Sequence, residues 1–405
     1  MRRSGEETAR RLTGPAVPLS FALYVHVPFC RAKCAYCDFT SFEGREAEIP
    51  RYIEMLLKEW EAVREILLAG RPYTVTSCYF GGGTPSLLPE SRLEILIQGL
   101  FPQGTDPGME FSLEANPESL SAAKLACWRR LGINRVSLGV QSFSDAMLRR
   151  LGRIHTARQA EEAVLSLIRG GWENWSLDLM FGLPGQHSRD FERDLERALS
   201  YRPPHLSAYH LTLAHDTLMD SLAREGRLHL PGEDVVLAMM DILEGETAKA
   251  GLVHYETSNF ARPGFACAHN LAYWRLRPYI GLGAGAVSYF EEGTPWGRHW
   301  KNPDDLSAYG EMAENGSWRF PRQEPLKRNE ALAETFLTGL RLAEGVDMKE
   351  MGGRFGPETV REVSRKIRPL VAAGWLEVNE DALKATQKGR RVLDSLLLEI
   401  LSDLE

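Results

Sequence analysis

The chain has 405 residues, of which 43% are hydrophobic and 25% charged, a composition typical of globular proteins. This length predicts two or three domains, or one large barrel with an extension, and can bury a core without disulfide support. The net charge of −7 argues against a broad electrostatic interface with nucleic acid. Residues 1–20 lack the apolar stretch of a secretory or twin-arginine signal, and no run approaches the roughly 20 apolar residues of a spanning helix. We therefore expect a cytoplasmic protein.

Residues 1–20 are polar and are expected to form a flexible lead-in. From there to about residue 250, β-branched or aromatic runs alternate with stretches whose apolar residues recur every three or four positions. Six strand-then-helix units in series predict parallel strands with right-handed crossovers, in an open doubly wound sheet or a β/α barrel. The expected strands are residues 22–27, 74–80, 109–115, 134–140, 174–180 and 205–211.

Polar residues and glycines follow these strands in the segments HVPFC, FGGGTPS, EANPES, GVQSF and MFGLPGQ. Ligands bind at the C-terminal ends of parallel strands in both architectures. The sequence therefore predicts a functional edge there, whichever architecture holds.

The pattern changes after residue 250. Residues 251–290 are rich in aromatic residues and glycine, which predicts strands and loops that close one side of the sheet, and residues 291–325 are polar and proline-broken, as in a connector. Residues 326–405 predict helices and a hairpin, similar to a winged-helix domain. Their 13 basic and 14 acidic residues favour a packing or docking role over DNA reading.

Three of the six cysteines, Cys30, Cys34 and Cys37, lie within eight residues directly after the first expected strand. Their C-x3-C-x2-C spacing suits a loop that wraps a metal centre, although zinc or a cubane cluster normally takes a fourth protein ligand. Phe39 stands where that cysteine would complete the run, which leaves one coordination site open for chemistry. The alternative is three packed cysteines, or zinc with a distant histidine, but the polar neighbours make poor core material.

This loop resembles that of the radical S-adenosylmethionine superfamily. The resemblance implies a partial (β/α)6 barrel in which the three cysteines bind three irons of a [4Fe-4S] cluster and S-adenosylmethionine chelates the fourth. The residues that it implies for S-adenosylmethionine are Tyr24, Gly82, Gly83, Thr84, Glu114, Gln141, Arg153 and Asp178. Taken singly, the glycines also suit a tight turn, and the strand-end polar residues also suit helix caps.

The motifs YxHxPFC, GGGTPS, LGVQSF and DLxxGLP occur in that order over residues 20–290 and resemble the oxygen-independent coproporphyrinogen III oxidase family. HNLAYW, residues 269–274, is similar to the haem-binding signature of the haem chaperone (HemW) group within it. The resemblance implies His269 as an axial haem ligand, Asn270 as its orienting partner, and Tyr273 and Trp274 as flat surfaces for the macrocycle. Cys267 is a further candidate ligand, and the alternative is a cluster of strand-end aromatics around a hydrogen-bonded histidine.

The leading hypothesis is thus a haem chaperone that passes haem to acceptor haemoproteins, respiratory ones included, and draws on an electron donor. The alternatives are a coproporphyrinogen III oxidase and, less favoured by charge, a DNA-binding regulator. The sequence is compatible with peripheral membrane contact and does not decide between a monomer and a dimer. GLGAGA, residues 281–286, lacks the setting of a dinucleotide site, and Cys78 and Cys127 are predicted to lie in the core.

Overall fold

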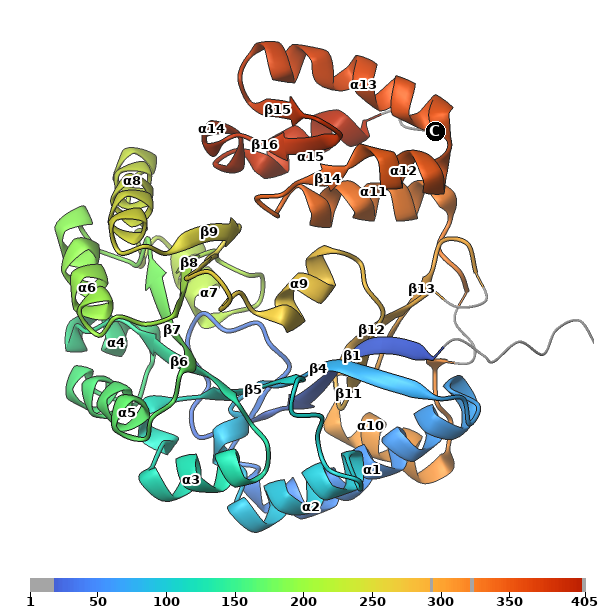
Figure 1. Ribbon diagram of the computed structural model, residues 1–405. Coiled ribbons are helices and arrows are strands. Elements are labelled where there is room, and N and C mark those ends of the chain that lie inside the picture. Colours follow the sequence, from blue (N-terminus) through green and yellow to red (C-terminus); the bar gives the residue numbers. More distant parts are fainter. Residues whose placement is uncertain (1–17, 292–293, 321–323, 403–405) are drawn as a thin grey trace, which may run out of the picture.

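The computed structural model describes residues 18–291, 294–320 and 324–402 (Figure 1). Most of the expected lead-in, residues 1–17, therefore lies outside the described residues. An 11-stranded sheet dominates the chain, and seven neighbouring strands in it are parallel. In spatial order these are β11 (Tyr279–Leu282), β1 (Leu19–Val27), β4 (Tyr73–Gly82), β5 (Glu110–Ala115), β6 (Arg135–Gln141), β7 (Asn174–Phe181) and β8 (His205–His210). The expected α/β fold is confirmed.

The two faces of this sheet differ in chemistry. Leucine, valine and phenylalanine side chains of the strands pack on surrounding helices in one large core. The opposite face carries buried serines at neighbouring positions, such as Ser137 beside Ser176. Figure 1 shows the curved sheet with helices along its outer side. These are α1 (Ile49–Ala62), α2 (Glu90–Leu100), α3 (Ala122–Arg130), α5 (Ala157–Arg169), α6 (Ser188–Ser200) and α8 (Glu233–Lys249), with the shorter α4 (Asp145–Leu151) and α7 (Leu218–Arg224) among the loops.

Antiparallel strands extend both edges of the sheet: β10 (Asn259–Ala261) and β9 (Val253–Glu256) beyond β8, and β12 (Val287–Phe290) and β13 (Arg298–Lys301) beyond β11. β9 and β13 do not pair with each other, so the barrel is partial. Figure 1 shows the short helix α9 (Ala268–Trp274) between the barrel and the C-terminal domain.

Residues 251–325 are more regular than expected. HNLAYW forms helix α9, where only strands and loops were predicted, and the expected connector contains β13 and helix α10 (Leu306–Asn315), which packs on α1. The reason is that β11 pairs with β1 and prolongs the sheet, so that α10 covers it. Residues 292–293 and 321–323 of that connector lie outside the described residues.

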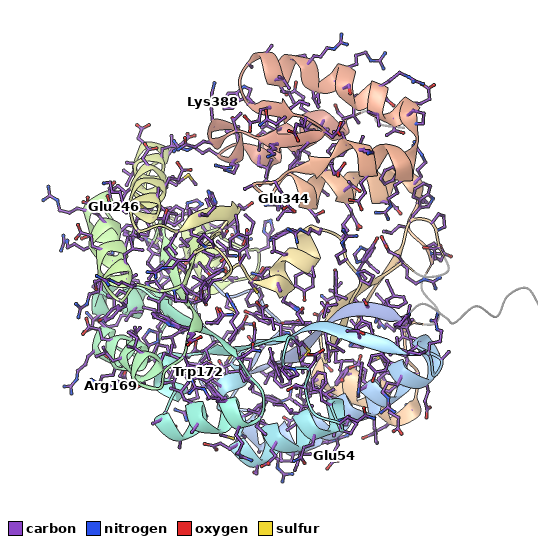
Figure 2. The ribbon with its side chains drawn as sticks, in the orientation of Figure 1. Glu54, Arg169, Trp172, Glu246, Glu344 and Lys388 are labelled. Carbon is purple, nitrogen blue, oxygen red and sulfur yellow. The ribbon has the colours of Figure 1, made fainter. Side chains whose placement is uncertain are left out.

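The C-terminal domain has its own core. It consists of α11 (Arg328–Gly339), α12 (Met348–Phe355), α13 (Pro357–Ala372), α14 (Gln387–Arg390) and α15 (Leu393–Leu401) around a small sheet of β14 (Val346–Asp347), β16 (Ala382–Ala385) and β15 (Leu376–Asn379). It contacts the barrel through a backbone hydrogen bond from Ala343 to Tyr255 and a bidentate ion pair of Arg275 with Glu344, on the side of the domain that Figure 2 shows turned toward the barrel. No helix in the described part of the chain has the length and apolar character needed to cross a membrane.

Candidate functional site

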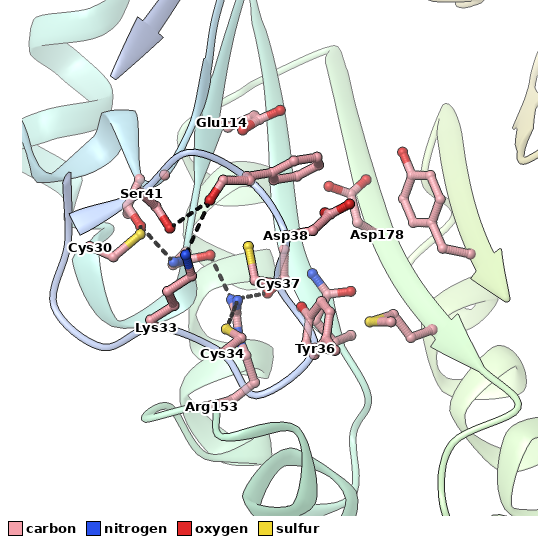
Figure 3. A pocket seen from close by; sticks show the side chains of 18 of the residues that line it. Cys30, Lys33, Cys34, Tyr36, Cys37, Asp38, Ser41, Glu114, Arg153 and Asp178 are labelled. Carbon is pink, nitrogen blue, oxygen red and sulfur yellow. Dashed lines mark hydrogen bonds between the residues drawn. The ribbon is translucent and has the colours of Figure 1, made fainter. Parts of the chain in front are cut away.

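A cavity of about 450 Å³ lies at the C-terminal ends of β4 to β8, as the strand-end pattern predicts (Figure 3). The structure brings nearly all of the predicted cluster and S-adenosylmethionine residues to its wall. These are Cys30, Cys34, Cys37, Gly82, Gly83, Thr84, Glu114, Gln141, Arg153 and Asp178. Tyr24 is the exception. Its ring stacks beside Tyr79, and its hydroxyl donates to His26 Nδ1 at 3.0 Å.

The cysteine loop is held by its backbone. The two-residue strands β2 (Phe29–Cys30) and β3 (Phe42–Glu43) pair across it, Ala35 N–H donates to Leu151 at 3.1 Å, and the Met219 amide donates to Ala35 at 2.9 Å. Gly152 ends α4 at φ +75°, and a Cβ there would lie 3.2 Å from the Ala35 nitrogen. Contacts with α4 and α7 therefore hold the middle of the loop in place.

The three thiols line one cavity wall, and Figure 3 shows them around a common space with Arg153 next to Cys34. Thr84 Oγ1 donates to Cys30 Sγ at 3.5 Å, and Arg153 Nη1 donates to Cys34 Sγ at 3.4 Å. Burial raises the pKa of Cys37 to about 11, so a thiolate there needs a positive partner. Among the described residues, no three ligand side chains converge on a single ion.

The glycine segment after β4 is both a tight turn and part of the cavity wall. A Cβ on Gly83 would lie 2.9 Å from backbone atoms of Val27, Pro28 and Phe29, so the cysteine loop fits only against glycine. The Gly82 amide donates to Glu114 Oε2 at 3.1 Å. The glycine motif can therefore form a tight turn and also line a binding site.

Two partly buried carboxylates face the cavity. Glu114 accepts from the Tyr79 hydroxyl at 2.9 Å, and burial raises its pKa to about 7. Asp178 accepts from the hydroxyls of Ser137 and Ser176, each at 3.0 Å, and burial raises its pKa as well. Both carboxylates can accept hydroxyl donors from a ligand in the cavity.

Asn116 joins the cavity residues and was missed by sequence reasoning, although it lies two positions after Glu114 in the same strand-end segment. Its Oδ1 accepts from Arg153 at 2.6 Å, and its Nδ2 donates to Thr84 at 3.2 Å. Arg153 also donates to the carbonyl of Gly139 at 2.9 Å. The guanidinium is therefore fixed in place at the wall.

Gln141 combines an unusual backbone conformation with an unpartnered side-chain oxygen. It ends β6 with φ +66°, a conformation that non-glycine residues seldom adopt. Its Oε1 is buried and has no hydrogen-bond partner within the described residues. An orphaned acceptor at the wall of an open cavity fits a bound molecule that carries a donor.

Phe39 lines the cavity, but 61% of its surface is exposed, so it shields the cluster loop from water only weakly. His26 lies beneath the loop and donates through Nε2 to the Thr40 carbonyl at 2.7 Å. Phe29, next to Cys30, is fully buried. The loop is therefore buried at Phe29 and exposed at Phe39.

His269 is buried inside the barrel, away from the cavity wall, with only 1% of its surface exposed. Its Nδ1 pairs with Ser77 Oγ and its Nε2 with the Tyr273 hydroxyl, each at 2.9 Å. Its ring stacks on Tyr79 with centroids 5.1 Å apart. Burial, and then the charge of Arg135, lower the pKa of His269 to about 3, so it is neutral. Ser77 and Tyr273, rather than Asn270, orient the imidazole.

The start of α9 is capped by Glu110, at the beginning of β5. Its carboxylate accepts the amides of Ala268 at 2.9 Å and His269 at 3.1 Å. Cys267 is fully buried and donates its thiol to the same carboxylate at 3.3 Å, and burial raises its pKa to about 12. Trp274, at the other end of α9, lies under the Arg341 guanidinium at 5.8 Å.

Comparison with known proteins identifies the family of the chain. Residues 24–198 match the family model of the Radical SAM superfamily, and residues 326–392 match that of the HemN C-terminal domain. The curated protein "Heme chaperone HemW" of Bacillus subtilis is 32% identical over 94% of this chain and 99% of its own length. The Escherichia coli protein of the same name is 36% identical over 95% of this chain and 99% of its own.

Among solved structures, coproporphyrinogen III oxidase (HemN) from Escherichia coli superimposes with a TM-score of 0.79. The alignment covers 96% of this chain and 91% of that chain. At 22% identity, this likeness establishes the fold alone.

Proposed function

The chain belongs to the HemW group of the radical S-adenosylmethionine superfamily, and on that premise we propose that it is a haem chaperone. Membership of the superfamily implies a [4Fe-4S] cluster and S-adenosylmethionine. In the proposal, Cys30, Cys34 and Cys37 hold the cluster. Together, the cluster and S-adenosylmethionine supply reductive cleavage of a sulfonium bond when bound.

The single observation that carries the cofactor part of the proposal is the shared cavity of about 450 Å³, which joins the three thiols to the predicted ligand residues. Glu114 and Asp178 would accept ribose hydroxyls, and Arg153 would face the methionine carboxylate beside Cys34. Gly82, Gly83 and Thr84 would flank the amino group, and Gln141 Oε1 would receive a donor. Tyr24 lies outside the cavity wall, so it would contribute only indirectly, by packing against Tyr79.

Haem binding is proposed for the α9 segment. Its support is the HNxxYW pattern and the name of the curated relatives, heme chaperone HemW. His269 would supply the axial nitrogen once Tyr273 releases Nε2, with Tyr273 and Trp274 beside the macrocycle and Asn270 next to the ligand. The thiol of Cys267 is fully buried and donates to Glu110, so, like His269, it would have to give up a hydrogen bond to act as a second ligand.

The proposed partners are acceptor haemoproteins, respiratory ones included, and an electron donor, in the cytoplasm. The C-terminal domain would serve docking. Its contacts with the barrel lie next to α9, where the Ala343 amide donates to Tyr255 at 3.0 Å and Arg341 covers Trp274.

Anaerobic reconstitution tests the function directly. The cluster-loaded protein is titrated with haem and then mixed with an apo-haemoprotein, while transfer is followed by absorbance and deoxyadenosine release is measured in the same sample. A chaperone transfers haem and leaves coproporphyrinogen III unchanged. Decarboxylation of coproporphyrinogen III without haem transfer would contradict the proposal and identify the protein as a coproporphyrinogen III oxidase.

A further inference from the structure

A continuous chain of hydrogen bonds links the cavity to the first turn of α9. Ser176 Oγ lies 3.0 Å from Asp178 Oδ1 and 2.8 Å from His205 Nδ1. On the other side of that imidazole, Nε2 lies 2.8 Å from the Tyr255 hydroxyl. The Tyr255 oxygen in turn accepts the backbone amide of Cys267 at 3.2 Å. The chain thus runs from a carboxylate at the cavity wall to the residue that begins α9.

The ends of this chain fix its direction. A backbone amide only donates, and an ionised carboxylate only accepts. Tyr255 must therefore donate to Nε2 of His205, and Nδ1–H of His205 must donate to Ser176, which donates to Asp178. Burial lowers the pKa of His205 well below its ordinary value, which keeps the ring neutral, as this arrangement requires. Every donor points toward Asp178, so the bonds polarise one another.

The middle of the chain is fully buried, and its side chains come from three strands. Ser176 and His205 are fully buried and lie opposite each other on the paired strands β7 and β8. Tyr255 comes from β9, and its backbone carbonyl also accepts the Ala343 amide of the C-terminal domain. Tyr255 therefore touches the barrel interior, α9 and the C-terminal domain at once.

We propose that His205 and Tyr255 are positioning residues that couple ligand binding at Asp178 to the order of α9. A carboxylate has about four acceptor positions, and the hydroxyls of Ser137, Ser176 and Ser207 occupy most of them. A ligand hydroxyl that donates to Asp178 adds a further hydrogen bond and fixes the carboxylate. This strengthens the series of hydrogen bonds that leads to Cys267. The coupling rests on the proposed function, because the family implies the ligand of the cavity and the haem role gives α9 its purpose.

Hydrogen exchange of the peptide that begins α9 tests the coupling in the full, cluster-loaded chain. Saturating S-adenosylmethionine should slow this exchange roughly fivefold in the wild type, the factor that corresponds to the net value of one hydrogen bond. Tyr255→Phe keeps the ring but removes the link, so the ligand should leave the exchange unchanged. Tyr201→Phe is the matched control, since the Tyr201 hydroxyl has no partner among the described residues.

Ser176→Ala breaks the same chain at its other end and should reproduce the Tyr255→Phe result. Two outcomes would overturn the coupling: an unaltered response in Tyr255→Phe, or an unresponsive α9 in wild-type protein that is demonstrably bound to S-adenosylmethionine. The exchange is measured without haem. A failure to bind haem would therefore refute the proposed function and leave the coupling standing.

Discussion

The cavity that contains the three thiols differs from the α9 segment in whether its buried polar groups have hydrogen-bond partners. The cavity is open, and its Gln141 Oε1 has no partner in the described structure. In α9, both nitrogens of His269 are bonded, and Glu110 caps the first amides. The cavity is thus shaped for a ligand in advance, whereas α9 must give up contacts before it can bind one.

This contrast has an energetic meaning. A ligand that enters a preformed site pays little for reorganisation. A ligand of His269 must first replace the buried hydrogen bond to Tyr273, and one such bond contributes about 1 kcal/mol net. Haem binding at α9 should therefore change when the hydrogen-bond partners of His269 are substituted. Ligand binding in the cavity should change when the wall residues themselves are substituted.

The largest expected effect concerns the thiols. Cys34→Ala should reduce the iron and sulfide content after reconstitution to background, because the cluster has no fourth cysteine nearby to replace the missing ligand. Cys127→Ala is the control, since this buried thiol lies on α3, outside the cavity wall. A full complement of iron and sulfide in Cys34→Ala would contradict the assignment of the cavity.

Asp178→Asn should weaken S-adenosylmethionine binding by about 10- to 100-fold, the range expected for a lost hydrogen bond to a charged group. Equilibrium dialysis of the cluster-loaded protein measures this. Glu161→Gln, on the surface helix α5, serves as the control, and equal affinities of Asp178→Asn and wild type would remove Asp178 from the site.

Glu114 predicts a pH dependence. Its pKa of about 7 lies above the ordinary value, so the carboxyl ionises only as the pH rises through neutrality. S-adenosylmethionine carries a net positive charge and favours the ionised form. Its affinity should therefore rise by up to about tenfold from about pH 6 to pH 8, one pKa unit of differential interaction. Glu114→Gln should flatten this dependence, and an unchanged profile in that variant would show that another group titrates.

Much of the barrel could be predicted from the sequence. All six expected strands are present as β1, β4, β5, β6, β7 and β8, because their apolar runs and terminal glycines are local signals. The cavity followed from these strands, since the C-terminal ends of parallel strands meet at one edge. The position of Arg153 could be predicted as part of this edge, but its bonds to Asn116 and Gly139 could not, because they depend on side-chain geometry.

Helix α9 could not be predicted in the same way. It has seven residues, too few to be stable alone, and its first amides bond to Glu110, more than 150 positions earlier in the chain. The exposure of Phe39 likewise depends on how the cysteine loop folds against α4 and α7. Both features are set by tertiary contacts that no local pattern encodes.

The smallest expected effect is also the most direct test of the contrast between the cavity and α9. Haem is titrated into wild type, His269→Ala and Tyr273→Phe, and binding is followed by absorbance. His269→Ala should lose the axial ligand, whereas Tyr273→Phe keeps the aromatic surface, frees Nε2 and should bind haem about fivefold more tightly, the value of one hydrogen bond. Indistinguishable titrations of the three proteins would contradict the claim that His269 must exchange its hydrogen bond to Tyr273 for a bond to haem.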